Sequence, residues 1–308
     1  MAGSRQRLLA LSIDLDALDL YLGLYGMGEP LSERAAQAVP AVATERFCDL
    51  CDALGVHGTL FVVGRDLALG RGHDQIRRAA REGHEIGSHS FAHDYALSRR
   101  SAQDIDDDLA RAEREIEAVI DGRVAGFRAP GYTLSPTLQD CLAKRGYAYD
   151  SSLLPSPPYY AAKAAVIGAL ALVGRRSHSI LGPIGQLLRP RVPHVDSHGV
   201  LELPVSVLPG MRAPFIGTLI TTTPAAVTTT LARQLRADEL VVIELHGIDL
   251  LDGSDGVPPE LTHRQRDLQV PATLKRQRIE TVLRDLLSER QPVTLLQSAR
   301  LVSGRTAA

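Results

Sequence analysis

Two histidines, His89 and His93, stand four residues apart in the stretch HEIGSHSFAHD, residues 84–94, where an apolar strand pattern runs into a turn. One turn of helix brings the side chains at i and i+4 onto the same face, so both imidazoles could bind one metal ion. A catalytic metal normally takes three protein ligands and leaves a position for water. The pattern therefore requires a third donor, and a carboxylate is the expected type.

Two carboxylates that could supply this donor follow the first apolar segment, LLALSIDLDA, which ends in Asp14 and Asp16. Residues i and i+2 of a strand point to the same side, so both acids can face one pocket at the carboxyl end of the strand. One acid could bind the metal while the other stays free to accept a proton. Taken alone, the two acids could simply end a strand and cap the next segment; together with the histidines they predict a metal site.

The composition fits a large core and gives no sign of a nucleic-acid partner. The chain has 308 residues, 44% of them hydrophobic, and a formal net charge of −2 from 34 Lys and Arg against 36 Asp and Glu. Barrels of alternating strands and helices commonly reach about 200–250 residues as one domain, so one domain plus an insertion is the simplest expectation. Without a broad basic surface, binding to nucleic acid is not expected.

The three cysteines, Cys48, Cys51 and Cys141, are too few and too unevenly spaced for a disulfide framework. Cys48 and Cys51 form a CxxC pattern, but the surrounding AVATERFCDLCDALG has helical apolar spacing, so we expect a buried helical pair. No signal peptide is recognised in MAGSRQRLLALSID, and the predicted location is therefore the cytoplasm.

Strand and helix patterns alternate along the chain. Strands are expected near residues 8–14, 57–63, 84–88, 124–129, 146–150, 201–207, 240–246 and 293–297. Helices are expected near residues 33–54, 73–82, 101–120, 135–145, 223–236 and 272–290, and the third of these begins with SAQD, which predicts a cap at Ser101. This alternation indicates parallel strands joined by crossover helices.

The side chains able to do chemistry fall at or just after the carboxyl ends of the predicted strands: Asp14, Asp16, His89, Arg128, Asp150 and His246. In parallel α/β barrels, that end of the strands carries the active site. Open α/β sheets obey a similar rule, so a Rossmann-like sheet is the alternative that the pattern leaves open.

Five motifs occur in order: SIDLDA, HSFAH, FRAPGYT, YDSS and ELHGID. In order and spacing they resemble the motifs of the NodB-type polysaccharide deacetylases, over about residues 8–250. The resemblance implies an α/β fold, a distorted (β/α)7 barrel, as a single domain over residues 1–308 with an insertion at 155–198 after the fifth strand.

The same resemblance implies metal-dependent hydrolysis of an amide or ester on a sugar. It assigns the metal to Asp16, His89 and His93, with Asp14 as the general base and Arg128 steadying that base. Tyr132 would lend its backbone N–H to an oxyanion hole, and His246 would be the general acid, oriented by Asp150. Zinc is the first expectation, and cobalt, nickel, manganese or iron suit similar ligands. A bound metal of this kind activates water and polarises a carbonyl at neutral pH.

The first motif departs from the family pattern, because one residue separates acids that are adjacent in many members. This spacing resembles the branch with peptidoglycan deacetylase-like, allantoinase-like and lipid-linked aminoarabinose deformylase-like proteins. A cyclic-amide hydrolase and a non-catalytic carbohydrate-binding relative are therefore the alternatives to removal of an acetyl or formyl group. The chain has no Trp, so we expect the acyl pocket to be built from other residues, such as Leu153, Leu154 and Leu245.

The segment after YDSS has a ten-residue apolar run, residues 164–173, which is short of the ~20 residues that span a bilayer. With Lys163 before it and Arg175 and Arg176 after it, the run could lie in a membrane interface; a buried helix over the barrel or a dimer contact is the alternative. The expected substrate is an N-acylated sugar, either a soluble glycoside or a lipid-linked glycan, with peripheral contact of residues 159–190 at the inner face of the membrane. RAPFIGT, residues 212–218, is expected to add a second apolar lip to the pocket.

Overall fold

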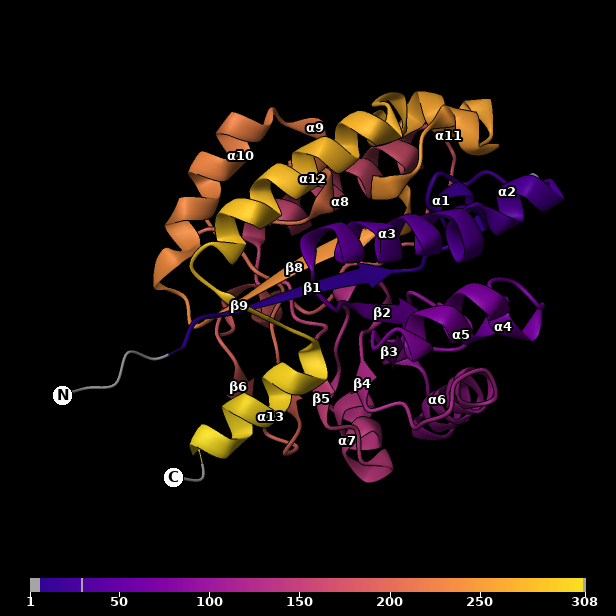
Figure 1. Cartoon of the computed structure of the whole chain (residues 1–308). Helices are drawn as coiled ribbons and strands as arrows, with labels where there is room; N and C mark the ends of the chain where they lie inside the picture. Colours follow the sequence, from indigo (N-terminus) through magenta and orange to yellow (C-terminus); the bar gives the residue numbers. More distant parts are fainter. Residues whose placement is uncertain (1–5, 29, 307–308) are drawn as a thin grey trace.

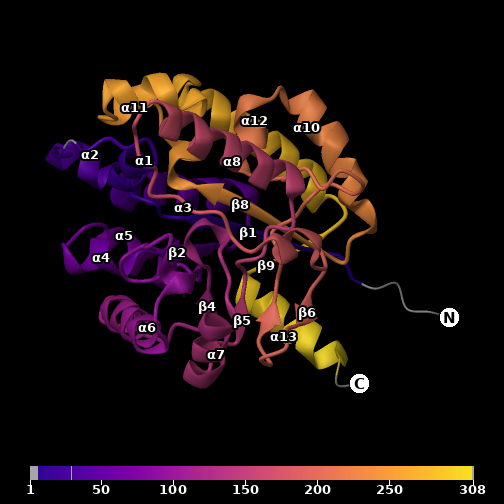
Figure 2. The same ribbon diagram turned by 180° about the vertical axis from the view of Figure 1, so that it is seen from behind.

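The computed structural model describes residues 6–28 and 30–306 and centres on a curled sheet that is surrounded by helices (Figures 1 and 2). Seven parallel strands follow one another in the order β7-β5-β4-β3-β2-β1-β8. Their bounds are β1 (Leu8–Asp14), β2 (Thr59–Val62), β3 (Glu85–Ser88), β4 (Gly126–Phe127), β5 (Tyr149–Asp150), β7 (Leu201–Glu202) and β8 (Leu240–His246). Past β7, the Ser206 N–H donates to the Val242 carbonyl of β8 at 3.1 Å, which joins the two ends of the sheet. The predicted distorted (β/α)7 barrel is confirmed.

Two short strands complete the sheet. β6 (His194–Val195) pairs antiparallel with β7. β9 (Gln291–Val293) pairs with Leu8–Ala10 of β1, while β2 pairs with Ser12–Asp14. Because β8 occupies the other edge along all of β1, β9 and β2 share one edge of β1 in succession.

The alternation of side chains along β1 separates two apolar cores from the polar end of the barrel. Leu9, Leu11 and Ile13 belong to the core between the sheet and the outer helices. Leu8 and Ala10 belong to a second core with residues from β5, β7, β8 and β9. Because i and i+2 share a face, the inward row continues from these two apolar residues into Ser12 and Asp14. The inside of the barrel is thus apolar at one end and polar at the other.

Most crossover helices match the sequence prediction. The longer ones are α3 (Thr44–Leu54), α5 (His73–Arg81), α6 (Ala102–Glu117), α7 (Pro136–Arg145), α10 (Ala225–Ala232) and α12 (Ala272–Leu287). The Ser101 hydroxyl accepts the Asp104 N–H at 3.2 Å, which confirms the predicted cap of α6. The expected helix over 33–54 is present as α2 (Glu33–Gln37), a π-helical turn at Ala38–Ala43, and α3. Cys48 and Cys51 are free and buried in α3, as predicted.

Other short helices lie around the carboxyl ends of the strands: α1 (Leu18–Leu24), α4 (Gly64–Ala68), α9 (Gly217–Thr222) and α11 (Pro259–Arg264). The predicted insertion contains α8 (Pro157–Leu172), which begins after a Ser156 cap, and then a largely irregular segment that leads to β6. In Figure 2, α8 lies on the side that faces the viewer.

The predicted strand at 293–297 is wrong over most of its length. β9 ends at Val293, and α13 (Leu295–Thr306) begins two residues later. The Thr294 hydroxyl accepts the Gln297 N–H at 3.3 Å, and the Gln297 side chain accepts the Thr294 N–H at 3.0 Å. This reciprocal pair is a capping box, so the T-x-x-Q spacing outweighs the apolar run that suggested a strand.

Candidate active site

Four polar side chains of the barrel lie on two neighbouring strands. The β1–β8 register pairs Ser12 with Glu244 and Asp14 with His246. Each strand carries its two residues at i and i+2, so all four point to the same side of the sheet. Ser12 and Glu244 are fully buried, and Asp14 is 2% exposed. The polar end of the barrel therefore contains two carboxyl groups and an imidazole held by regular strand pairing.

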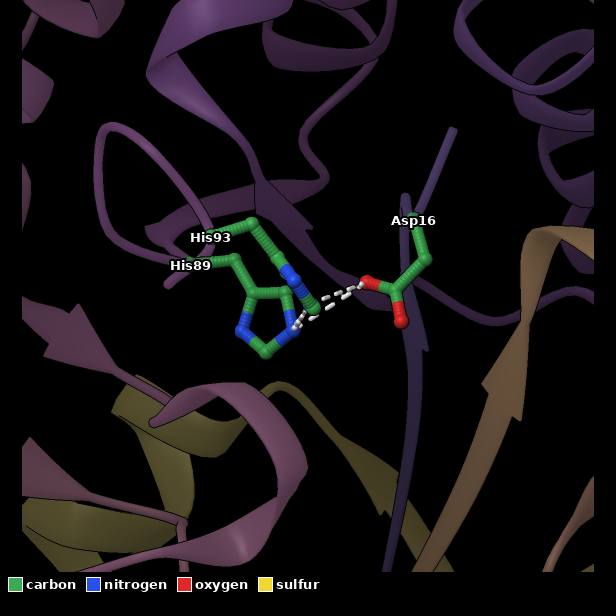
Figure 3. A group of neighbouring side chains, drawn as sticks. All are labelled: Asp16, His89 and His93. Carbon is green, nitrogen blue, oxygen red and sulfur yellow. Dashed lines mark hydrogen bonds and ion pairs between the residues drawn. The ribbon is translucent and has the colours of Figure 1, made fainter. Parts of the chain in front are cut away.

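The structure brings Asp16, His89 and His93 together (Figure 3). Asp16 Oδ1 lies 3.2 Å from His89 Nε2 and 3.1 Å from His93 Nε2, and the two imidazole nitrogens are 3.2 Å apart. Metal–ligand distances of about 2.0–2.2 Å place ligand atoms roughly 3.0–3.5 Å from one another. The three side chains are therefore spaced as ligands of one ion would be.

The chemistry of these donors also fits a divalent cation. His89 Nδ1 lies 2.7 Å from the Arg128 carbonyl oxygen, so Nδ1 carries a proton and the Nε2 of a neutral ring presents its lone pair to Asp16. Asp16 Oδ1 is buried and has no hydrogen-bond partner among the described residues. Three electron-pair donors at this spacing repel one another unless a cation lies between them. One carboxylate and two imidazoles suit zinc and other divalent transition metals.

The loop that carries the histidines is not the helical turn that the sequence predicted. Ser90 and His93 have φ values of 64° and 51°, and no helix covers residues 89–93. The Ser90 hydroxyl accepts the His93 N–H at 3.0 Å, a bond within the loop itself. Asp108 of α6, which sequence reasoning missed, accepts the N–H groups of Phe91 and Ala92 at 2.8 and 3.1 Å. These side-chain bonds, rather than helical hydrogen bonds, orient the two imidazoles.

Arg128 is completely buried and holds Asp14. Its Nη1 donates to Asp14 Oδ1 at 2.7 Å and to the Ser12 hydroxyl at 3.0 Å. Its Nε and Nη2 donate to the carbonyl and the hydroxyl of Ser151 at 2.8 and 3.0 Å. Burial alone would raise the pKa of Asp14, but the positive charges of Arg128, His89 and His246, Arg128 first, together outweigh burial and hold that pKa below the usual 3.8. Asp14 is therefore an ionised carboxylate beside the three candidate ligands, with Oδ2 at 3.7 Å from His89 Nε2.

Glu244 is a second carboxyl group of the site, and the sequence analysis did not single it out. Burial and the charge of Asp14 raise the pKa of Glu244 to about 8, so this side chain is protonated at neutral pH. The Tyr132 hydroxyl donates to Glu244 Oε2 at 2.7 Å. The signal was present in ELHGID, because Glu244 stands two residues before His246 on the same face of the strand.

His246 lies beside the acids of the site, but Asp150 does not orient it. Burial by itself would lower the pKa of His246. The negative charges of nearby carboxyl groups, of which Glu244 has the largest effect, outweigh burial and raise the pKa of His246 to about 9. Its backbone N–H donates to Asp249 at 2.8 Å. The predicted contact with Asp150 is wrong: Asp150 accepts the Ser152 hydroxyl and lies opposite Glu202 in the β5–β7 register. The sheet explains this, since Asp150 and His246 are on strands that are not neighbours.

Tyr132 reaches the site through its hydroxyl, while its backbone N–H donates to the Ala129 carbonyl at 3.1 Å. The N–H that we expected in an oxyanion hole is therefore occupied in this conformation. Gly131 and Tyr132 both have φ near 61°, a left-handed geometry that is costly for Tyr. Two side chains of α8 hold this turn: the Tyr160 hydroxyl donates to the Tyr132 carbonyl at 3.2 Å, and Lys163 Nζ donates to the Gly131 carbonyl at 3.1 Å.

A cavity of about 420 Å³ adjoins these groups. Its polar floor contains Asp14, Asp16, His89 and His246, and its walls contain five tyrosines: Tyr21, Tyr25, Tyr95, Tyr132 and Tyr159. Ile216 and Thr218 also line it, which confirms the lip expected from residues 212–218. Leu153, Leu154 and Leu245 are fully or almost fully buried and do not line it, so the predicted acyl pocket is wrong. Leu245 alternates with the inward residues of β8 and packs in the outer core.

Comparisons with known proteins identify relatives of part of the chain. Residues 37–149 match the family model described as polysaccharide deacetylase. The chain is 27% identical over 161 residues to the peptidoglycan deacetylase of Helicobacter pylori, a match that covers 51% of this chain and 54% of that protein. The chain thus spans about half the length of this curated relative.

Solved structures share the fold. The crystal structure of a Mycobacterium smegmatis protein classed as a polysaccharide deacetylase aligns with a TM-score of 0.63 and 20% identity, over 99% of this chain and 93% of that one. The Xyl-CE4 domain of a multidomain xylanase from the hindgut metagenome of Trinervitermes trinervoides aligns with a TM-score of 0.50 and 15% identity, over 97% and 92% of the two chains. The five motifs lie at one end of a barrel of this kind, and over residues 37–149 the chain matches the polysaccharide deacetylase family.

Proposed function

We propose that the chain is a metal-dependent hydrolase that removes an N-acyl group, acetyl or formyl, from a sugar-containing substrate. The observation that carries the proposal is the proximity of three candidate ligands, Asp16, His89 and His93, to an ionised Asp14 that is not needed as a ligand. When bound, a divalent cation would supply Lewis acidity, making water more acidic and polarising the acyl carbonyl. Zinc is the first candidate, followed by cobalt, nickel, manganese or iron.

Asp14 is suited to accept the proton of the attacking water. Arg128 occupies Oδ1 and keeps the carboxylate ionised, which leaves Oδ2 toward the candidate ligands. A general base that is fixed in this way contributes on the order of 10²–10⁴ to the rate. The buried guanidinium thus positions the base and sets its charge state, without contacting the substrate itself.

His246 is suited to donate a proton to the departing amine. It lines the cavity, and its pKa of about 9 keeps it protonated at neutral pH. A cation at Asp16 would oppose this increase, since Asp16 is one of the carboxylates that raise the pKa of His246. Tyr132 Oη lies 3.5 Å from His246 Nε2 and can hold the imidazole in place.

The size and lining of the cavity favour a sugar. Its volume of about 420 Å³ is large for a small cyclic amide, and its rim is open, since Val166 on the wall is 49% exposed. The tyrosine rings offer flat apolar faces with a polar edge, which suit the faces and hydroxyl groups of a sugar. Lys163 adds an ammonium group to the wall, which favours a substrate that also carries a carboxylate or phosphate. A lipid-linked sugar phosphate or an acidic glycoside has this chemistry.

The test is release of acetate or formate from a panel of N-acylated sugars, using protein loaded with zinc or cobalt. We expect turnover that disappears with a chelator and returns with the metal. The Asp14→Asn variant should bind the same metal and release acid more slowly by a factor on the order of 10²–10⁴. Turnover that is indifferent to chelation, or that stays at the wild-type rate in Asp14→Asn, would contradict the proposal. Metal binding without turnover of any substrate would favour a non-catalytic carbohydrate-binding role.

A further inference from the structure

The segment that follows β5 contains basic but no acidic residues, and it exposes several large hydrophobic side chains. Between Asp150 and Asp196 the sequence contains five Lys or Arg residues and no Asp or Glu, in a chain whose acids outnumber its bases by 36 to 34. Six of the thirteen large hydrophobic residues that are exposed in the described part of the chain lie within residues 166–188. They are Val166, Leu172, Val173, Leu181, Ile184 and Leu188, with exposed fractions from 39% to 89%.

These side chains border the mouth of the active-site cavity. α8 contributes Val166 and Ile167 to the cavity wall, and the chain after α8 contributes Ser177 and Ser179. Val166 is therefore both part of the wall and part of the exposed apolar surface. We call residues 164–188, with the six exposed hydrophobic side chains, the apolar rim.

Two cations of the segment, Arg175 and Arg176, lie within the apolar rim. Gly174 separates them from Leu172 and Val173, both arginines are exposed, and neither forms an ion pair with any described residue. Arg191, by contrast, pairs with Asp238 at 2.7 Å. Exposed apolar side chains flanked by unpaired arginines, without acids, complement a surface that is apolar inside and negatively charged outside.

From these observations we infer that the apolar rim docks on a bilayer that contains anionic lipids, with the mouth of the cavity at the lipid headgroups. Among the described residues, no helix has both the length and the apolar character to cross a membrane, so the contact is peripheral. Leu172, at 89% exposed, and Ile184, at 82%, are the deepest anchors. Docking does not require catalysis. Its consequence, that the sugar is taken from a lipid carrier at the membrane surface, rests on the proposed function.

Contact with a membrane would also affect the turn at Gly131 and Tyr132, because α8 binds that turn. Tyr160 and Lys163 of α8 donate to the carbonyls of Tyr132 and Gly131, two residues whose backbone is left-handed. A lipid surface that fixes α8 would thus also fix the turn that carries Tyr132. This places membrane docking and substrate positioning on the same helix.

Sedimentation with vesicles tests the inference. The full-length, metal-loaded protein is mixed with vesicles of phosphatidylcholine alone or with 30% phosphatidylglycerol, and the pelleted fraction is measured. We expect binding to the anionic vesicles that weakens with salt, because the charge attraction acts only over about 10 Å in 0.1 M salt. Arg175→Gln with Arg176→Gln should weaken binding about 25-fold, since each basic residue near such a surface strengthens binding about fivefold.

Substitution of the anchors provides the second arm. Leu172→Asp with Val173→Asp, and separately Ile184→Asp, should reduce binding at least tenfold. Leu69→Asp, a change at a leucine that is 59% exposed at the C-cap of α4, should not. Release of acyl groups from a soluble substrate should be unchanged in all of these variants, so that loss of docking and loss of catalysis are read separately. Binding that is equally weak to both vesicle types overturns the inference. A dimer in light scattering that the Leu172→Asp and Val173→Asp changes abolish, without vesicle binding, assigns the rim to a second copy of the chain instead.

Discussion

Replacing Arg128 by Met should destabilise the fold by about 3–5 kcal/mol, the usual cost of removing one partner of a buried ion pair. Arg128 has no exposed surface, and its guanidinium makes four hydrogen bonds, to Ser12, Asp14 and twice to Ser151. Met keeps much of the side-chain volume but leaves the Asp14 carboxylate, 2% exposed, without a cation at hydrogen-bond distance. The nearest remaining candidate among the described side chains is His89, at 3.7 Å.

The assay is denaturant unfolding in a chelator, so that metal binding does not contribute, with the double variant Asp14→Asn/Arg128→Met completing a cycle. Because the two groups are in direct contact, we expect a coupling energy of about 1–3 kcal/mol and a double variant that is more stable than the sum of the single changes predicts. Arg7→Met is the matched control. It removes an ion pair with Glu289 whose side chains are 46% and 39% exposed, and should cost less than about 1 kcal/mol. A loss below about 1 kcal/mol in Arg128→Met, or strict additivity, would refute the account of Arg128 as the counter-ion that holds Asp14.

Three further predictions concern single side chains. Asp14→Asn should lower kcat by a factor on the order of 10²–10⁴ and leave metal content at the wild-type level; loss of metal would mean that Asp14 is a ligand. Lys163→Met removes a bond to the Gly131 carbonyl and should affect all substrates, but it should raise KM about tenfold more for acidic N-acyl sugars than for neutral ones. An equal effect on both would exclude charge recognition. Burial raises the pKa of Asp150 to about 7 and raises the pKa of Glu202 above its usual value. The contribution of these two acids to the stability of the fold is therefore greatest below about pH 4, and it is lost as the pH rises to about 7. Glu202→Gln should therefore make the melting temperature less dependent on pH between 5 and 8, and an unchanged pH dependence would show that the two acids do not share a proton.

The position of the site could be predicted from the sequence because strand ends determine it. Asp14, Asp16 and His246 follow apolar strands, and the carboxyl ends of parallel strands meet at one end of a barrel whatever the loops do. The i and i+2 spacing also predicted that both acids of SIDLDA face the same pocket. The same reasoning would have identified Glu244, had the alternation along β8 been followed two residues back from His246.

The contacts of the site could not be predicted, because they depend on which strands and loops are neighbours. Asp150 and His246 both end strands, yet β5 and β8 are not adjacent, so no spacing along the chain reveals that Asp150 pairs with Glu202. The loop at residues 89–93 relies on Ser90 and on Asp108 of a distant helix, and its i, i+4 histidines suggested a helical turn that is absent. Similarly, the cavity walls come from α1, α8 and the loop with Tyr95, rather than from the leucines near the strand ends.

The number of metal ions bound per chain, and the residues on which it depends, tests the central claim most directly. After chelation and reloading with zinc or cobalt, the wild-type protein should bind one equivalent by calorimetry and elemental analysis, and Asp16→Asn, His89→Ala and His93→Ala should each lose it. Cys48→Ala is the control, because Cys48, Glu82 and His84 form another group that could hold an ion, although burial raises the pKa of the Cys48 thiol to about 12. Retention of metal by Asp16→Asn or His93→Ala, or its loss in Cys48→Ala, would contradict the assignment of the site.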